Sequence, residues 1–210
     1  MRVHASARHA LLRVIWTGCA LAKNPDRDAA TRDLAEIRAI ASGDSAAFAR
    51  LIDREAPRLL RFAQGMLGSA EEAEDVAQET LLRLFENAAT WEPQARIGTW
   101  LHRVCYNRAI DHLRRRRALV EEDALAELPD GAELPDAALV RSEAVRSVRD
   151  AIAHLPHRQR TAILLFHFQE LPQRDAATIM GVSETAFESL LARARRRMRG
   201  FLNASGGGDG

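Results

Sequence analysis

The chain is 210 residues long, which allows two small domains. Its 47% hydrophobic content excludes a globally disordered protein. Its two cysteines, Cys19 and Cys105, are too few for a disulfide scaffold. The formal net charge of +1 hides a strong segregation: residues 103–117 carry six arginines and one acid, 119–137 carry seven acids and no base, and 188–199 carry five arginines and one acid. Two basic stretches that flank an acidic one indicate two contacts with a polyanion.

Residues 1–28 precede the first helical pattern and contain two weak motifs. Arg2 and Arg8 stand before an apolar stretch, as in a signal peptide, and the Thr-Gly-Cys sequence ending at Cys19 is similar to a lipoprotein cleavage site. Arg13 interrupts the apolar stretch, and no run in the chain reaches the ~18 residues that a membrane helix needs. We therefore expect a cytoplasmic protein with a poorly ordered extension, or with a start codon placed too early, and no stable membrane insertion.

Helical periodicity runs through the rest of the chain without sustained strand patterns, which predicts an all-α fold. The stretch 118–137 contains prolines and an Asp-Gly pair and lacks a long periodic segment, so it is predicted to be a flexible acidic linker. It divides the chain into two small helical domains, 29–117 and 138–202, and the glycine-rich tail 203–210 is expected to be disordered. The predicted helices lie near 29–41, 45–66, 70–88, 96–117, 138–153, 157–169, 173–180 and 184–199.

The helix predicted at 70–88 has an apolar face and an acidic face. At about 100° per residue the inner face contains Ala73, Val76, Ala77, Leu81, Leu84, Phe85 and Ala88. The opposite face contains Asp75, Gln78, Glu79, Leu82 and Glu86. A single exposed leucine usually has no functional meaning, but Leu82 among carboxylates and an amide also suits a helix that docks on a basic partner. From spacing alone both interpretations stay open.

The helix predicted at 96–117 presents a mixed aromatic and basic stripe. Its buried residues are predicted to be Ile97, Leu101, Val104 and Cys105, and its stripe contains Trp100, Arg103, Asn107 and Arg114. An aromatic ring, an amide and guanidiniums on one stripe suit a groove for unpaired bases, because they can stack on a base, read its edge and hold the backbone. The preceding loop carries another indole, Trp91. The alternative is that Trp91 and Trp100 are core or hydrophobic-staple residues, and for Trp100 the sequence does not decide.

Residues 173–191 have the pattern of a helix-turn-helix. Ala177 is the small residue required where the two helices cross, Gly181 is placed at the turn, Pro172 suits the start of the first helix and Ser183 suits the N-cap of the second. The apolar stripe of the second helix contains Phe187, Leu190, Leu191, Ala194 and Met198. Its other side, which contains Glu184, Thr185, Glu188, Ala192, Arg195 and Arg196, offers short polar groups to base edges and guanidiniums to phosphates, which predicts DNA binding. The alternative is an amphipathic helix pair with a solvated arginine face.

These segments resemble the extracytoplasmic-function (ECF) sigma factors of bacteria. EDVAQETLLRLF (74–85) and RIGTWLHRVCYNRAIDHLRRRR (96–117) resemble their regions 2.2 to 2.4, and 155–198 resembles their region 4. The resemblance implies that the first domain docks on the clamp helices of core RNA polymerase and opens the −10 element of promoter DNA. It also implies that the second domain binds the −35 element and the polymerase flap, and that an anti-sigma factor is a further partner.

The resemblance implies roles for individual residues. Those expected to contact core polymerase are Asp75, Gln78, Glu79 and Leu82. Those expected to act at the −10 element are Trp91, Arg96, Trp100, Arg103, Asn107, Arg114 and Arg115, with 89–96 as the specificity loop. Those expected to act at the −35 element are Glu184, Thr185, Glu188, Ser189, Arg193 and Arg196. Glu188 and Leu190 stand where relatives are often basic, and Pro172 replaces a more usual serine. The −35 sequence is therefore not expected to be typical. Glu188 can accept a hydrogen bond from a cytosine amino group.

Two other function classes fit parts of the sequence. A helix-turn-helix regulator would bind duplex DNA without polymerase and would have no use for the acidic face of the helix at 70–88. An enzyme would need site chemistry, and the nearest approaches are Asp111-His112 and the pair His154 and His157. Neither has a paired nucleophile, a phosphate loop or a third metal ligand at suitable spacing. We therefore expect no catalytic residues, no metal, no cofactor and no small-molecule substrate.

Overall fold

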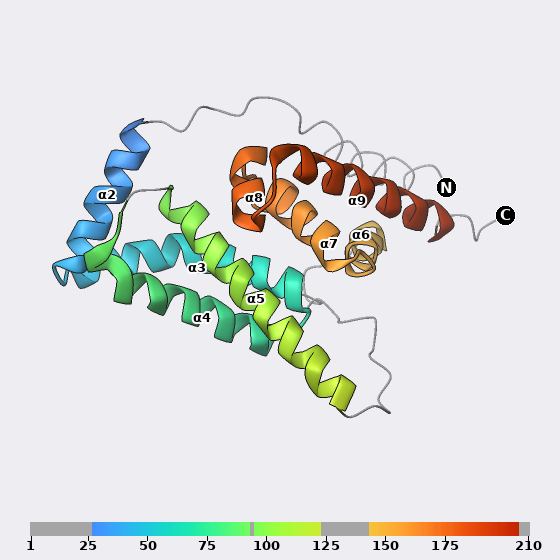
Figure 1. Cartoon of the computed structure of the whole chain (residues 1–210), viewed down its shortest axis with the longest axis horizontal. Coiled ribbons are helices and arrows are strands. Elements are labelled where there is room, and N and C mark those ends of the chain that lie inside the picture. Colours follow the sequence, from blue (N-terminus) through green and yellow to red (C-terminus); the bar gives the residue numbers. More distant parts are fainter. Residues whose placement is uncertain (1–26, 93–94, 123–142, 206–210) are drawn as a thin grey trace.

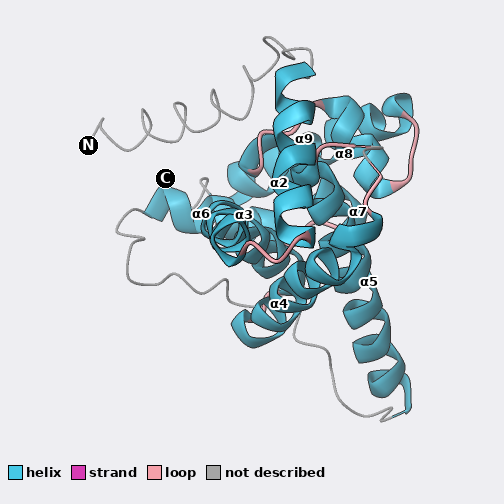
Figure 2. Ribbon diagram, turned by 90° about the vertical axis from the view of Figure 1, so that its left-hand side faces the viewer, coloured by secondary structure: helices cyan, strands magenta, loops and turns pink. Residues whose placement is uncertain are grey.

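The computed structural model describes residues 27–92, 95–122 and 143–205, and the regular structure in these ranges is helical, with no strand (Figure 2). The predicted all-α fold is therefore confirmed. The helices of the first domain are α2 (Arg27–Ala41), α3 (Ser45–Leu67), α4 (Ala70–Asn87), the short 3₁₀ helix η1 (Ala88–Thr90) and α5 (Ile97–Glu122). The helices of the second domain are α6 (Glu143–Ala153), α7 (His157–Ile163), the π-helical turn η2 (Leu164–Phe168), α8 (Gln173–Met180) and α9 (Glu184–Ser205) (Figure 1).

Short polar residues and glycines set the helix boundaries of the first domain. Asp44 caps α3 by accepting a hydrogen bond from the Ala47 N–H at 3.0 Å. Gly68 ends α3 in the left-handed conformation, with φ of +74°. The next residue, Ser69, caps α4 by accepting from the Glu72 N–H at 3.3 Å. Helices α3 and α4 are therefore joined by a tight turn and pack as neighbours.

Helices α3, α4 and α5 enclose the core of the first domain. Its fully buried residues include Leu51, Leu59, Phe62, Met66, Val76, Leu84, Ile97, Leu101 and Cys105. The prediction that Phe85 belongs to the inner face of α4 is wrong, because 51% of its surface is exposed. Phe85 lies about 60° from Leu82 around the helix axis, which places it on the flank, where its ring contacts that of Phe48 with centroids 5.2 Å apart.

The second domain contains the predicted helix-turn-helix in α8 and α9. Gly181 ends α8 with φ of +63°, a conformation that glycine adopts without strain. Ser183 caps α9 by accepting from the Ala186 N–H at 3.2 Å. Ala177 is 2% exposed and Phe187 is fully buried, as the crossing of the two helices requires. The predicted apolar stripe of α9 is buried at all five positions: Phe187, Leu190, Leu191, Ala194 and Met198.

Helix α2 begins at Arg27, so the last two residues of the stretch 1–28 predicted as a poorly ordered extension are helical. Two other helices extend five or six residues beyond their predicted ends. Helix α5 continues to Glu122, inside the stretch 118–137 predicted as linker, because the residues that follow the arginines are good helix formers and the first proline comes later. Helix α9 passes through Gly200 to Ser205, because Phe201 and Leu202 pack against the core. The predictions for 1–26, for 123–142 and for 206–210, and the middle of the predicted specificity loop at 93–94, fall outside the described residues.

The two domains pack against each other, with α8 beside the first part of α5 and η2 against α3 (Figure 1). Gln169 stands at the centre of this interface: its carbonyl accepts from Arg58 Nη2 at 2.9 Å and its side-chain Nε2 donates to the Arg58 carbonyl at 3.3 Å. Its Oε1 lies 3.2 Å from Nε2 of the fully buried His102. Burial lowers the pKa of His102, which favours the neutral ring in this interface.

Candidate polymerase-binding and nucleic-acid-binding surfaces

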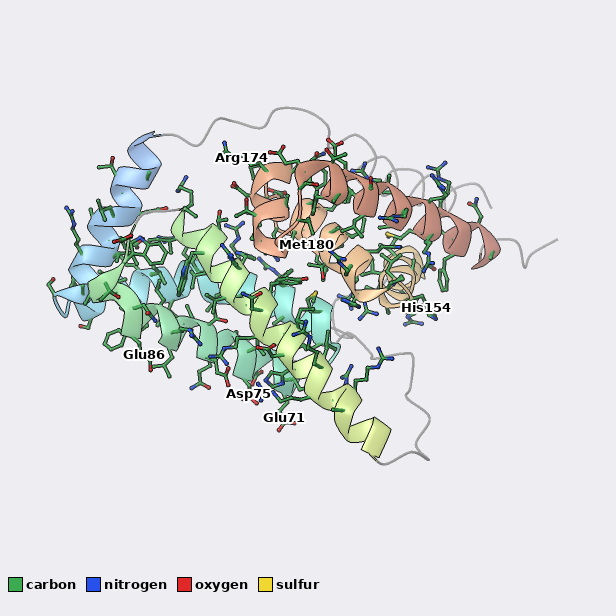
Figure 3. The ribbon with its side chains drawn as sticks, in the orientation of Figure 1. Glu71, Asp75, Glu86, His154, Arg174 and Met180 are labelled. Carbon is green, nitrogen blue, oxygen red and sulfur yellow. The ribbon has the colours of Figure 1, made fainter. Side chains whose placement is uncertain are left out.

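The acidic face of α4 is exposed as predicted. Asp75, Gln78, Glu79 and Leu82 all lie at the surface, and 54% of Leu82 is exposed. The labelled residues Glu71, Asp75 and Glu86 lie along α4 on the side of the molecule away from α8 and α9 (Figure 3). Phe85 enlarges the apolar part of this surface. Two exposed apolar side chains ringed by carboxylates form a surface suited to a basic protein partner.

An aromatic cavity lies between the loop after η1 and the first turns of α5. Trp91 and Trp100 meet edge to face with ring centroids 5.0 Å apart, and both side chains are half-buried. The cavity measures about 350 Å³. It is lined by Asn87, Thr90, Trp91, Glu92, Ala95, Thr99, Trp100, Arg103 and Thr178. Two indoles and a guanidinium around an open cavity can hold an unstacked base through ring contacts and a charged contact.

The structure brings together only part of the predicted −10 set. Trp91, Trp100 and Arg103 line one cavity. Arg114 lies 14 residues after Trp100 on α5, which is about 21 Å from Trp100 along the helix axis. Asn107 and Arg115 are exposed on α5 outside that cavity. The side chain of Arg114 is 78% exposed and lies 4.0 Å from Asp111. The distal part of α5 is thus a basic surface separate from the aromatic cavity.

Arg96 lies in an ion pair that the sequence did not indicate. Its Nε lies 2.6 Å from Oδ2 of Asp33 on α2. Sequence reasoning could not find Asp33, because it is distant in the chain and belongs to no motif. Thr178 was missed for the same reason, since it reaches the aromatic cavity from α8 of the second domain.

The second domain covers one edge of that cavity. Thr178 on α8 lines the cavity together with Thr99 on α5, and Asp175 lies one turn earlier on α8. Burial raises the pKa of Asp175. In this arrangement the scaffold helix of the helix-turn-helix lies directly against the start of α5.

All six predicted −35 residues are exposed on α9: Glu184, Thr185, Glu188, Ser189, Arg193 and Arg196. Arg195 differs from the prediction that it faces outward with them, because it is half-buried. Its guanidinium carbon lies 5.6 Å from the centre of the Phe166 ring, and its Nη2 lies 3.2 Å from Nε2 of His167. Burial, and then the charge of Arg195, lower the pKa of His167 to about 4. Arg195 therefore packs η2 against α9.

Comparison with known proteins identifies the class of protein that these domains define. The Sigma-70 region 2 family matches residues 51–119, and the Sigma-70 region 4 family matches residues 146–198. Together they describe a two-domain transcription initiation protein of the sigma-70 type. The chain belongs to the ECF RNA polymerase sigma factors, as its curated relatives show. The region 2 match separates it from regulators that carry only a helix-turn-helix.

Two relatives illustrate this membership. The ECF sigma factor SigW of Bacillus subtilis is 28% identical over 173 residues, which cover 78% of this chain and 92% of that protein. SigM of Mycobacterium tuberculosis is 32% identical over 165 residues, which cover 77% of this chain and 82% of that protein.

Two solved structures have the same fold. The sigma factor RpoE of Bartonella quintana, bound to the anti-sigma factor NepR, matches with a TM-score of 0.66 at 25% identity and covers 74% of this chain and 96% of that one. CnrH, bound to the cytosolic domain of CnrY, matches with a TM-score of 0.62 at 25% identity and covers 82% of this chain and 97% of that one.

Neither a membrane helix nor a metal site occurs in the parts of the chain that the structure describes. Within residues 27–92, 95–122 and 143–205, every helix is too short or too polar to cross a membrane. In the same ranges, His, Cys, Asp and Glu side chains do not gather in groups of three that could hold a metal ion.

Proposed function

We propose that this sigma factor binds core RNA polymerase through the acidic face of α4, opens and reads the −10 element with the aromatic cavity and the basic length of α5, and binds the −35 element with α9. The observation that carries the first part is Leu82, exposed at the centre of a carboxylate-rich helix face. A solvent-exposed leucine adds little to the fold, whereas an apolar contact ringed by charges adds both affinity and orientation in a complex.

The −10 assignment rests on the cavity between Trp91 and Trp100. Base stacking on an aromatic ring tolerates any base, so a second group must supply discrimination. Arg103 at the cavity wall can bind a phosphate or a base edge, and the exposed amide of Asn107 lies one turn further along α5. Arg114 and Arg115 would then hold the duplex backbone.

The −35 assignment rests on the exposed side of α9. The first turns carry Glu184, Thr185, Glu188 and Ser189, which are short or acidic groups suited to base edges in the major groove. Arg193 and Arg196 follow on the same exposed side and suit phosphates. Because Glu188 accepts rather than donates hydrogen bonds, it would favour a cytosine amino group.

We also propose an anti-sigma factor as a partner, a cytoplasmic location and the absence of catalytic activity. The support for the partner is that RpoE and CnrH, which share this fold, were each solved in complex with a binding protein. The absence of catalytic activity is supported by His154, the nearest approach to a metal ligand. Its ring packs on that of Phe201 with centroids 4.7 Å apart, and its Nδ1 is hydrogen-bonded to the Asp150 carbonyl.

Co-purification with core polymerase tests the proposed function. Leu82→Arg or Asp75→Arg should abolish recovery with core, because each places a like charge against a basic partner surface. Ala41→Arg, at an exposed position at the end of α2, is the matched control and should bind core as the wild type does. Circular dichroism should show that all three variants keep their helix content. Undiminished binding by folded Leu82→Arg and Asp75→Arg proteins would refute the assignment.

A further inference from the structure

Asp33 of α2 contacts the first residues of α5. Its Oδ2 accepts from the backbone N–H of Ile97 at 3.0 Å and from Arg96 Nε at 2.6 Å. The Asp33 side chain is only 15% exposed, so solvent screens the contact weakly. The two segments lie 64 residues apart in the chain, yet one carboxylate oxygen joins them.

This contact is an N-cap supplied from another helix. The carbonyl of Arg96 accepts from the Trp100 N–H at 3.0 Å, so Arg96 occupies the position where a helix normally carries its own cap. The arginine side chain cannot accept a hydrogen bond. Asp33 accepts from the Ile97 N–H in its place, and its negative charge also favours the positive end of the α5 dipole.

The same helix holds the other end of the loop. Helix α2 packs against η1 (Ala88–Thr90), immediately before Trp91. It therefore contacts the segment just before Trp91 and, through Asp33, the segment just before Trp100. The positions of these two segments set the positions of Trp91 and Trp100, whose indoles meet edge to face.

We propose that Asp33 is a positioning residue for −10 recognition, one that fixes the start of α5, the Arg96 guanidinium and, through them, the aromatic cavity. This role rests on the function proposed above for Trp91 and Trp100. In this role Asp33 does not contact DNA. It acts through Ile97 and Arg96, so a change at Asp33 alters −10 reading while polymerase binding and −35 reading stay intact.

Two variants of Asp33 and one matched control separate this role from general support of the fold. Asp33→Ala removes both hydrogen bonds. Asp33→Asn keeps an oxygen that can accept from Ile97 but removes the charge that pairs with Arg96. Glu36→Gln is the control, because Glu36 lies on the same helix and pairs with Arg54 on α3, away from the loop.

The first measurement uses the full chain without DNA. Amide hydrogen exchange at Ile97 should become about fivefold to tenfold faster in Asp33→Ala, the effect expected when an N-cap is lost. In a Trp16→Phe background, where Trp91 and Trp100 are the remaining tryptophans, acrylamide quenching of tryptophan emission should rise in the same variant as the indole pair loosens. Asp33→Asn should show a smaller change, and Glu36→Gln should match the wild type at Ile97.

The second measurement uses the reconstituted holoenzyme on two promoter pools, one randomised across the −10 element and one across the −35 element. Each promoter carries a transcribed barcode that identifies its randomised element, because the −10 and −35 elements are not themselves transcribed. Barcodes counted in run-off transcripts from Asp33→Ala should show a weakened preference at −10 positions, by about fivefold, and an unchanged preference at −35 positions. Recovery with core should be unchanged. A variant that is merely less stable would lose yield from both pools equally and keep its base preference.

Three outcomes would overturn the proposal: a wild-type −10 preference in Asp33→Ala, unchanged exchange at Ile97, or an equal effect of Glu36→Gln. If Asp33→Ala fails to fold, Asp33→Asn decides by the same readouts. A wild-type holoenzyme without any −10 preference would refute the proposed function itself, whereas the exchange result at Ile97 would still report on the cap.

Discussion

Leu164 of the second domain packs directly over Gly65 of the first. A Cβ atom at position 65 would lie 2.7 Å and 2.8 Å from the two terminal carbons of Leu164. Gly65 is inside α3, where glycine is about 1 kcal/mol less favourable than alanine. The absence of a side chain there is what lets the two domains approach, beside the contacts of Gln169 with Arg58 and His102.

We expect Gly65→Val to separate the domains without unfolding either one. Leu164 is only 6% exposed, so it has little room to move aside for a branched side chain. Small-angle scattering of the chain without polymerase should show a larger radius of gyration. We expect the two domains to separate when they bind the polymerase clamp and flap, so core polymerase should bind the variant, which has already lost the interface, at least as tightly. Gly200→Val is the matched control, since nothing lies within 4 Å of a Cβ there; a Gly65→Val chain as compact as the wild type would contradict the expectation.

Local patterns in the sequence predict the helices and most of the exposed site residues. Ala177, Gly181 and Ser183 mark the helix-turn-helix because each has a requirement that is met locally: small size, positive φ or a side-chain oxygen. The acidic face of α4 follows from the helical period alone. Phe85 was misplaced because periodicity gives a direction around the helix but not the width of the neighbouring helices that cover it.

The contacts between distant segments could not be predicted in this way. Asp33 has the same local environment as any acid on an amphipathic helix, and only the fold brings it to the start of α5. Gln169 and Gly65 likewise carry no local pattern that indicates a domain interface. Arg195 was expected at the DNA-facing surface, but the Phe166 ring and His167 provide a half-buried position that sequence spacing does not show.

Trp100→Ala and Asn107→Ala should impair promoter opening more than promoter capture. Loss of a stacking platform costs ~1–3 kcal/mol per base, and Trp100→Ala also removes the edge contact with Trp91. Duplex capture depends mainly on arginines, so closed complexes should still form. Permanganate reactivity of unpaired thymines measures opening directly. Wild-type reactivity in both variants would refute the role of this stripe, and a relaxed preference at one −10 position is expected for Asn107→Ala.

Acid should destabilise the second domain through His167. Its pKa is lowered by burial to about 4, whereas histidine in an unfolded chain titrates near 6.5. Below about pH 6.5 the unfolded chain therefore takes up a proton that the folded domain does not. The contribution of neutral His167 to the free energy of unfolding is complete above that pH and declines as the pH falls toward 4. Thermal unfolding between pH 7 and pH 4.5 should show a weaker pH dependence in His167→Gln, whose amide oxygen can still accept from Arg195. His112→Gln, on α5, is the control; an identical pH dependence in His167→Gln and the wild type would contradict this.

The chain should bind promoter DNA weakly on its own and tightly with core polymerase. In the structure the start of α5 lies against α8, and Thr178 of the second domain lines the aromatic cavity, so the −10 surface is partly covered. The bases that this cavity would hold are also exposed only after melting. The exposed arginines of α5 and α9 should give the lone chain salt-sensitive contacts with phosphates and little sequence preference. A gel-shift series at one fixed salt concentration, with and without core, measures both states. We expect specific binding, melting and transcription from a defined start only when core is present. Tight, sequence-specific binding by the lone chain would show that the domain packing seen here does not limit access to the −10 surface.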